Sequence, residues 1–100
     1  EEHMSELLIS GVTIKDPAKF QDYLQRSKDL ASLHGAQLLA SGKAPRALSG
    51  SPAPHQLAVI VRFPGMEVLD AWHASEAYQA LIPLREEASD QEITVYEVTA

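Results

Sequence analysis

The residues best suited to bind a small molecule lie in one short stretch of the chain. Trp72, Ser75 and Tyr78 follow one another at three-residue intervals, and Arg85 comes about two helical turns later. An indole and a phenol can wall an apolar pocket, and the Ser75 or Tyr78 hydroxyl can orient a ligand oxygen. A guanidinium can hold a carboxylate through two hydrogen bonds. The pattern predicts a cleft for a small, partly apolar organic acid or aromatic molecule, to which Tyr23 from an earlier segment contributes.

Each of these residues also has a purely structural interpretation. Trp72 and Tyr78 can be aromatic residues of the core, and Ser75 can cap a helix that begins after it. The cap is the better supported role for Ser75. Arg85 can instead form surface ion pairs with the acidic residues that follow it, which are Glu86, Glu87 and Asp90.

Three side chains, His73, Tyr78 and His34, could transfer a proton if the bound molecule were a substrate. The protein would then be a cofactor-free isomerase or monooxygenase acting on an aromatic or lactone substrate. His34 falls on the apolar side of a helix near its end, where a structural hydrogen bond explains it better than general-base work. Asp70 and His73 could supply two metal ligands, but no third is visible, so we expect neither a metal nor a cofactor. A ligand-free structural or stress-linked module is a further alternative.

Apolar periodicity indicates the elements that must position these residues. Residues 7–14 form an apolar run that predicts a strand, and Asp16 and Pro17 after it are typical of a helix cap and a first helical position. Apolar side chains then recur at three- and four-residue steps. This spacing predicts a helix that ends at His34, with Gly35 as the residue that closes it.

The second half of the chain predicts a similar succession of elements. We expect a strand at 36–42 with a bent continuation over 43–49, a loop at 50–54, a strand at 56–63, a helix after Pro64 and Gly65, a second helical piece from Ser75 interrupted by Pro83, and a last strand at 93–98. The order predicts a single α+β domain over 5–100. It is a ferredoxin-like sandwich, in which two helices cover one face of an antiparallel four-stranded sheet. Residues 1–3 are expected to be an expression scar.

The predicted sheet is apolar on both faces. Residues 57–61 read Leu-Ala-Val-Ile-Val without a polar interruption, and residues 7–9 are similar. The face away from the helices would then expose apolar side chains unless a second copy, a loop or the C-terminal tail covers it. A symmetric homodimer through this face is the preferred interpretation. Arg62 needs a partner, which would be an acidic ligand or Glu97 if it faces the cleft, and water if it lies at the rim.

Composition narrows the classes of partner. The 100 residues include 14 acidic and 8 basic side chains, which give a net charge of −6, and the basic residues do not cluster. Nucleic acid and membranes are therefore not expected partners. Without cysteine the chain can form neither disulfides nor thiolate metal sites, and we expect a cytoplasmic protein.

Several short motifs taken together resemble a known family. They are Thr13-Ile14-Lys15-Asp16-Pro17, His34-Gly35-Ala36, Val59-Ile60-Val61-Arg62-Phe63-Pro64, Trp72-His73-Ala74-Ser75-Glu76-Ala77-Tyr78-Gln79 and Leu84-Arg85. With these motifs the chain resembles the domain of unknown function 1330 (DUF1330) family of the dimeric α/β-barrel superfamily. It departs from the family at His73, where members often carry Tyr or Phe, and at Arg62, where an acidic residue is common.

The resemblance implies a homodimer whose two sheets form an α/β barrel, with a cleft between sheet and helices in each subunit. It implies no particular activity. Distant members of the superfamily include cofactor-free monooxygenases, muconolactone isomerases, haem proteins and stress-responsive barrel proteins, and a shared fold does not select among them.

Overall fold

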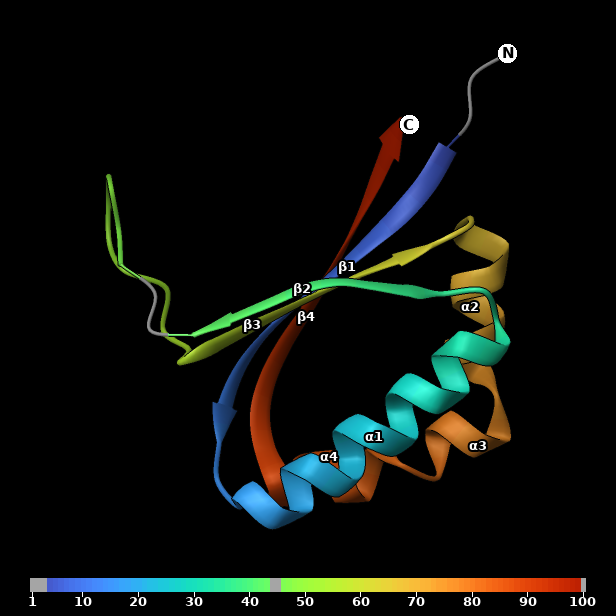
Figure 1. Cartoon of the computed structure of the whole chain (residues 1–100), viewed down its shortest axis with the longest axis horizontal. Coiled ribbons are helices and arrows are strands. Elements are labelled where there is room, and N and C mark those ends of the chain that lie inside the picture. The colour runs from blue at the N-terminus through green and yellow to red at the C-terminus, as the bar shows by residue number, and fades with distance from the viewer. Residues whose placement is uncertain (1–3, 44–45, 100) are drawn as a thin grey trace.

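The architecture is a four-stranded antiparallel sheet with its helices on one side (Figure 1). The computed structural model describes residues 4–43 and 46–99. The elements are β1 (Met4–Ile14), α1 (Pro17–Leu33), β2 (Gln37–Lys43), β3 (Leu57–Phe63), α2 (Met66–Ala74), α3 (Glu76–Gln79), α4 (Ile82–Ala88) and β4 (Ser89–Thr99). The strand order is β2-β3-β1-β4, so β1 and β3 are central and β2 and β4 are edges. The predicted ferredoxin-like α+β fold is confirmed. Residues 1–3, interpreted as an expression scar, lie outside the described residues.

The ends of α1 form as the sequence predicts. The Asp16 carboxylate accepts a hydrogen bond from an amide of the first turn at 3.1 Å, and Pro17 is the first helical residue. His34 is the C-cap, and Gly35 follows with a φ of +78°, a left-handed conformation that glycine adopts at little cost. These two ends fix the length of the helix that carries Tyr23 to the sheet.

Two strand boundaries differ from the sequence prediction. β4 begins at Ser89 rather than at residue 93, because it pairs with β1 along its whole length and Ser89 lies opposite Ile14. The predicted continuation of β2 is wrong for residues 46–49, which form a loop, while 44 and 45 lie outside the described residues. β2 is an edge strand whose pairing ends with Lys43 opposite Leu57, so β3 offers no further backbone to extend it.

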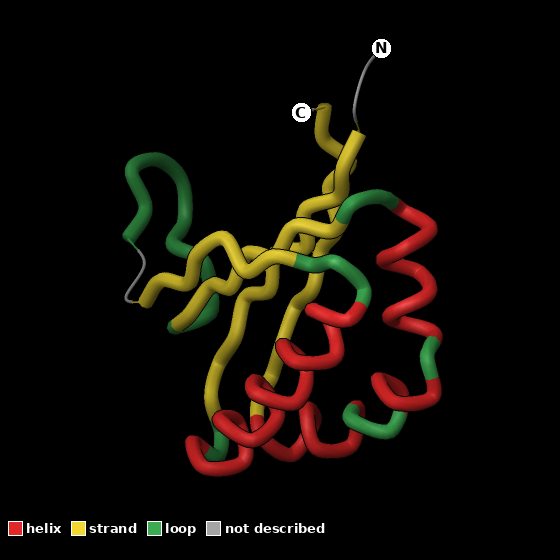
Figure 2. Tube along the Cα trace, turned by 45° about the vertical axis from the view of Figure 1, so that its right-hand side comes forward, coloured by secondary structure: helices red, strands yellow, loops and turns green. Residues whose placement is uncertain are grey.

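Side chains of the central strand β1 alternate between the two faces of the sheet. Leu8 and Val12 point towards the helices and are buried in the core, whereas Leu7 and Ile9 point away and are only half-buried. We call these the inner and the outer face. Figure 2 shows that the helices lie to one side of the strongly twisted sheet. The outer face is therefore apolar in its middle, where Ile60 of β3 lies opposite Ile9.

The loop between β2 and β3 is attached to one end of the outer face. His55 contacts Thr13 Oγ1 through Nδ1 at 2.9 Å and Glu92 Oε1 through Nε2 at 2.6 Å. Its ring packs on Gly11, where an added Cβ would lie 2.7 Å from His55 Cδ2, so a larger residue would displace the ring. The loop is thus attached near the end of β1, and Ile9 in the middle of the face is still only half-buried.

One acidic side chain is buried on the inner face. Glu6 is 1% exposed, and neither of its carboxylate oxygens has a hydrogen-bond partner among the described residues. Burial raises the pKa of the Glu6 carboxyl above its ordinary value, and the negative charges of Glu97 and Asp70 raise it further. The folded state therefore holds this proton at pH values where the unfolded chain has lost it, so stability falls as pH rises through that interval.

Replacing Glu6 with glutamine is expected to stabilise the protein at neutral pH, because the variant keeps the shape of the side chain without its charge. The Tm should rise at pH 7 and change little at pH values below the ordinary carboxyl pKa of about 4.3. Differential scanning calorimetry across this pH range measures the effect. Glu67→Gln, at an exposed position in the first turn of α2, is the matched control and should give no gain. An equal gain in both variants would contradict the explanation.

Candidate functional site

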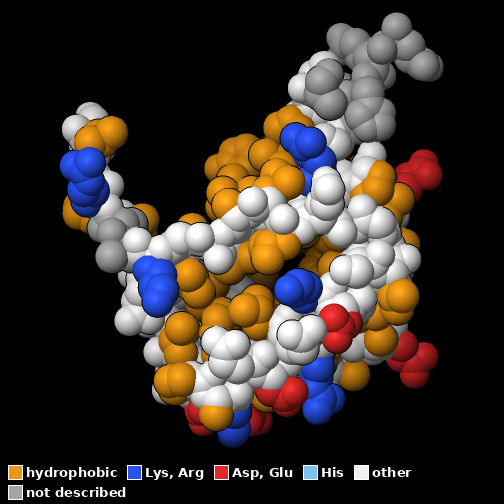
Figure 3. Space-filling view, viewed as in Figure 1, with side chains coloured by type: hydrophobic (Ala, Val, Ile, Leu, Met, Phe, Trp, Pro, Cys, Tyr) orange, Lys and Arg blue, Asp and Glu red, His pale blue; other side chains and the backbone are white. Residues whose placement is uncertain are grey.

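A cavity of about 540 Å³ separates the inner face of the sheet from the helices. Figure 3 shows it as a hollow with hydrophobic side chains on its walls. The apolar lining comes from sheet and helices and includes Leu8, Val12, Phe20, Val59, Val61, Phe63, Leu69, Ile93 and Val95. The polar lining residues include Ser10, Tyr23, Ser27, Lys28, Asp70, Trp72, His73, Tyr78, Arg85 and Gln91. Size and composition are those of small-molecule sites, which usually measure roughly 300–1,000 Å³.

The break between α2 and α3 brings two aromatic rings together on the cavity wall. Ser75 Oγ accepts a hydrogen bond from the Tyr78 amide at 3.2 Å and donates one to the Trp72 carbonyl at 2.6 Å. The predicted cap role of Ser75 is thereby confirmed. Trp72 lies in the last turn of α2 and Tyr78 in the short helix α3, and their ring centroids lie 4.3 Å apart at an angle of 43°. The serine thus acts on the site through the two rings that it positions.

A chain of hydrogen bonds runs from the cavity edge to its interior. Arg85 Nη1 donates to Tyr78 Oη at 3.0 Å, and Tyr78 Oη lies 2.9 Å from Tyr23 Oη. Burial raises the pKa of the Tyr23 phenol well above its ordinary value, and the neighbouring Tyr78 raises it further. The Tyr23 hydroxyl therefore keeps its proton at neutral pH, and the pair of phenols lies beside the positive charge of Arg85.

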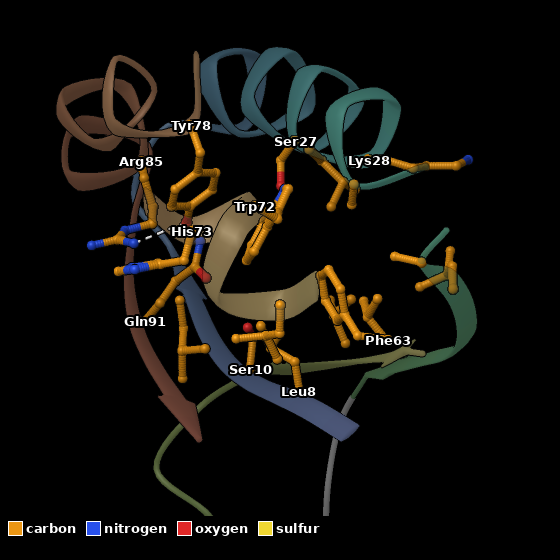
Figure 4. Close-up of a pocket in the computed structure, with 18 of the residues that line it drawn as sticks. Leu8, Ser10, Ser27, Lys28, Phe63, Trp72, His73, Tyr78, Arg85 and Gln91 are labelled. Atoms are coloured by element: carbon orange, nitrogen blue, oxygen red, sulfur yellow. Dashed lines mark hydrogen bonds between the residues drawn. The ribbon is translucent and has the colours of Figure 1, made fainter. Parts of the chain in front are cut away.

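The indole nitrogen of Trp72 is a hydrogen-bond donor that has no acceptor among the described residues. The side chain is 5% exposed, and its Nε1 is buried without a hydrogen-bond partner among the described residues. Its ring packs against Phe63, with centroids 5.1 Å apart, as well as against Tyr78. Figure 4 shows the indole extending from α2 across the cavity towards Ser27 on α1. A buried N–H of this kind ordinarily has an acceptor.

The charges around the cavity favour an anion. Arg85 and Lys28 line it on opposite sides, as Figure 4 shows, and Asp70 is the acidic residue that the structure places in the lining. His73 lies at the rim next to Tyr78, with ring centroids 5.5 Å apart. The cavity is thus cationic in a chain whose net charge is −6. Arg85 also contacts Glu86 through Nε at 3.2 Å, so the predicted surface pair and the cavity contact coexist.

The structure brings together five of the residues named from the sequence. Tyr23, Trp72, His73, Tyr78 and Arg85 all line the cavity.

Three other named residues lie elsewhere. Ser75 is the helix cap, and His34 Nδ1 lies 3.2 Å from the carbonyl oxygen of Leu30 in its own helix. Arg62 lies on the outer face, because its neighbour Val61 lines the cavity and successive strand side chains point to opposite faces. The proposed site therefore omits Arg62, Ser75 and His34.

Sequence reasoning missed several polar lining residues. Ser10 could have been placed by alternation along β1, since it lies two residues from Leu8 and from Val12. Gln91 was not predicted to face the cavity because the last strand was expected to begin at residue 93. Lys28 is exposed on α1, and nothing in its sequence context distinguishes it from a solvated lysine.

No group of three or more His, Asp or Glu side chains within residues 4–43 and 46–99 is arranged to hold a metal ion. Within those same ranges, no helix is both long and apolar enough to cross a membrane.

Solved structures with this fold are functionally diverse. A protein of unknown function from Rhodopseudomonas palustris superposes with a TM-score of 0.77 at 15% identity, covering 96% of this chain and 82% of that one. SnoaB, a cofactor-independent oxygenase from Streptomyces nogalater, gives a TM-score of 0.66 at 10% identity, covering 94% and 91%. A dimeric ferredoxin-like protein of unknown function from Thermobifida fusca gives 0.61 at 14% identity, covering 96% and 92%. At these identities the likeness establishes the fold alone.

The sequence comparisons give one family. No curated protein matches the chain significantly. The family model described as domain of unknown function (DUF1330) matches residues 5–99, which is almost the whole chain. The resemblance drawn from the short motifs is thereby confirmed, and the chain belongs to the DUF1330 family.

Proposed function

We propose that the cavity binds a small, partly apolar organic acid, with its carboxylate at Arg85 and Tyr78 and its apolar body against the inner face of the sheet. The observation that carries this proposal is the hydrogen-bonded chain from Arg85 to Tyr78 and Tyr23 in the wall of an otherwise apolar cavity. A guanidinium at the edge of a low-dielectric space attracts an anion more strongly than one in water. The positive charge of Lys28, which also lines the cavity, attracts an anion as well.

Binding, rather than catalysis, is the function that this geometry supports best. A general base must lie within hydrogen-bond reach of the proton that it removes. Among the described residues, the hydrogen-bond partners of the Tyr23 and Tyr78 hydroxyls are each other, Ser27 and Arg85, and no histidine or carboxylate is among them. His73 is the imidazole of the lining and contacts Tyr78 through its ring, with centroids 5.5 Å apart. The raised pKa of Tyr23 also makes its phenolate scarce.

A thermal-shift and calorimetric titration with short aromatic and aliphatic carboxylates tests the proposal. Neutral amides of the same acids serve as ligand controls. Arg85→Gln should weaken binding of the acids by roughly 10- to 100-fold, which is the usual worth of a hydrogen bond to a charged group, and should leave the weak binding of the amides unchanged. Arg26→Gln is the matched protein control, because Arg26 is exposed on α1 and pairs with Asp22 at 2.8 Å. Equal binding of acids and amides, or equal loss in both variants, would refute the proposal.

We further propose that a second copy of the chain covers the outer face, as a homodimer. Leu7, Ile9 and Ile60 are half-buried there and form a continuous apolar area in the middle of the face. Burying such area stabilises an assembly by roughly 25 cal/mol per Å². The structurally similar protein from Thermobifida fusca is described as dimeric, which is consistent with the proposal.

Charges on the outer face support the same partner. Arg62 lies towards one end of the face, and its Nε is buried without a hydrogen-bond partner among the described residues. Glu92 and Asp90 lie towards the other end. A two-fold axis that crosses the strands within the interface would place the basic end of one copy over the acidic end of the other. Within one subunit Glu92 already contacts His55 at 2.6 Å and Asp90 contacts Lys15 at 3.5 Å, so Arg62 of a second copy would join these pairs rather than meet free carboxylates.

A further inference from the structure

We propose that the ligand of this cavity carries, besides its carboxylate, an uncharged acceptor oxygen such as a ketone carbonyl, and that Trp72 Nε1 binds that oxygen. The inference rests on the proposed function and names its substrate class: oxo acids with an apolar body. It assigns Trp72 the role of a specificity-determining residue.

The first support is the state of the indole N–H. The Trp72 side chain is 95% removed from solvent, since it is 5% exposed, and Nε1 is without a partner in the part of the chain that the structure describes. A donor buried in this way loses its hydrogen bond to water and gains none from the protein. An acceptor atom of a ligand in the cavity would accept a hydrogen bond from Nε1, and this hydrogen bond would increase the affinity for that ligand.

The second support is that three hydroxyl groups around the indole, those of Ser27, Ser75 and Tyr78, already have hydrogen-bond partners. Its ring neighbours are Phe63, at a centroid distance of 5.1 Å, and Tyr78, at 4.3 Å. Tyr78 Oη is already engaged by Arg85, and Ser75 Oγ accepts from the Tyr78 amide. Ser27, towards which the indole extends, is bonded to Tyr23. We therefore assign the acceptor of Nε1 to the molecule that fills the cavity.

The third support concerns charge. The cavity lining is mostly apolar, and its acidic residue in the described part of the chain, Asp70, is on the same helix as Trp72. A second carboxylate at the indole would be desolvated without a cation and would be repelled by Asp70. A carbonyl oxygen accepts a hydrogen bond at a much smaller desolvation cost. The site therefore combines a place for an anion at Arg85 with a place for a neutral oxygen at Trp72.

Matched pairs of acids test the inference. Phenylpropionate and phenylpyruvate differ by one carbonyl next to the carboxylate, and phenylbutyrate and benzoylpropionate differ by one carbonyl next to the ring. In the wild type, the oxo member of at least one pair should bind roughly ten-fold tighter than its parent. Trp72→Phe keeps an aromatic ring but lacks the N–H, and it should abolish that preference, so that the variant binds each oxo acid and its parent equally. Arg85→Gln should weaken both members equally.

A second measurement does not depend on the variant. Trp72 is the single tryptophan of the chain, so a ¹H–¹⁵N spectrum of the wild type contains one indole N–H signal. That signal should move to lower field with the preferred oxo acid and stay near its free position with the parent acid.

The outcomes separate the two proposals. If the parent acids bind through Arg85 but neither oxo acid is preferred, or if the preference survives in Trp72→Phe, the inference about Trp72 is overturned and the acid site stands. An unchanged indole signal with a bound oxo acid overturns it as well. If none of the four acids binds, the proposed function fails and the inference fails with it.

Discussion

Replacing Ile9 with glutamate is expected to convert the proposed homodimer to a monomer of 10.9 kDa. Ile9 lies in the middle of the outer face opposite Ile60, where a carboxylate would be buried without a partner in the assembled form. In a free subunit the same position is only half-buried, so the variant should still fold. Light scattering coupled to size-exclusion chromatography at micromolar concentration measures the mass, and circular dichroism verifies the fold.

Leu33→Glu is the matched control for this change. Leu33 is 83% exposed at the end of α1, away from the sheet, and the substitution introduces the same charge in place of a similar apolar side chain. The control should stay dimeric. A wild-type mass of 10.9 kDa at micromolar concentration would rule out the dimer directly, and so would an Ile9→Glu variant that elutes unchanged.

Truncation of Tyr78 should have the largest effect on stability. The side chain is fully buried, contacts Trp72 and is hydrogen-bonded with Tyr23 and Arg85. Tyr78→Ala is expected to cost about 3–5 kcal/mol, the range for large aromatic residues in cores. For a domain of this length such a loss lowers the Tm by roughly 12–40 °C. Thermal unfolding followed by circular dichroism measures it.

Tyr78→Phe separates the role of the ring from that of the hydroxyl. The ring contacts are kept, but Tyr23 Oη and Arg85 Nη1 lose their common partner. The expected cost is about 1–3 kcal/mol, which is the usual price of a buried polar group left unpaired. If the phenylalanine variant were as unstable as the alanine variant, the hydroxyl rather than the ring would dominate, and the packing argument would be wrong.

Local signals in the sequence were sufficient for the order of elements and for several of their ends. Asp16 and Pro17 act within one helical turn, and Ser75 bonds to residues three positions away on either side, so both effects can be deduced from neighbours in the chain. The same holds for the division of the later helix at Pro83, which lies in the first turn of α4. Helix caps and helix interruptions depend on hydrogen bonds between residues close in the chain, so they can be predicted from the sequence almost completely.

The site was harder to predict because it depends on contacts between distant elements. Trp72 and Tyr78 were open to two interpretations, core or pocket wall, and the structure gives them both roles. Arg62 could be placed on the outer face only once the register of β3 against β1 was known, since a shift by one residue would reverse it. Gln91 entered the cavity because β4 pairs further along β1 than its apolar pattern suggested.

The position of β4 at the edge of the sheet determines how a molecule could approach the cavity. Ile93 and Val95 line it and are nevertheless 37% and 39% exposed, because β4 is an edge strand and has no neighbouring strand on that side within residues 4–43 and 46–99. The cavity is therefore a trough with one open flank rather than a sealed chamber. The carboxylate of a long organic acid could bind at Arg85 while its apolar chain extends over β4 into solvent. The open side therefore sets no upper limit on ligand length. A ligand could also enter there without a conformational change of the protein.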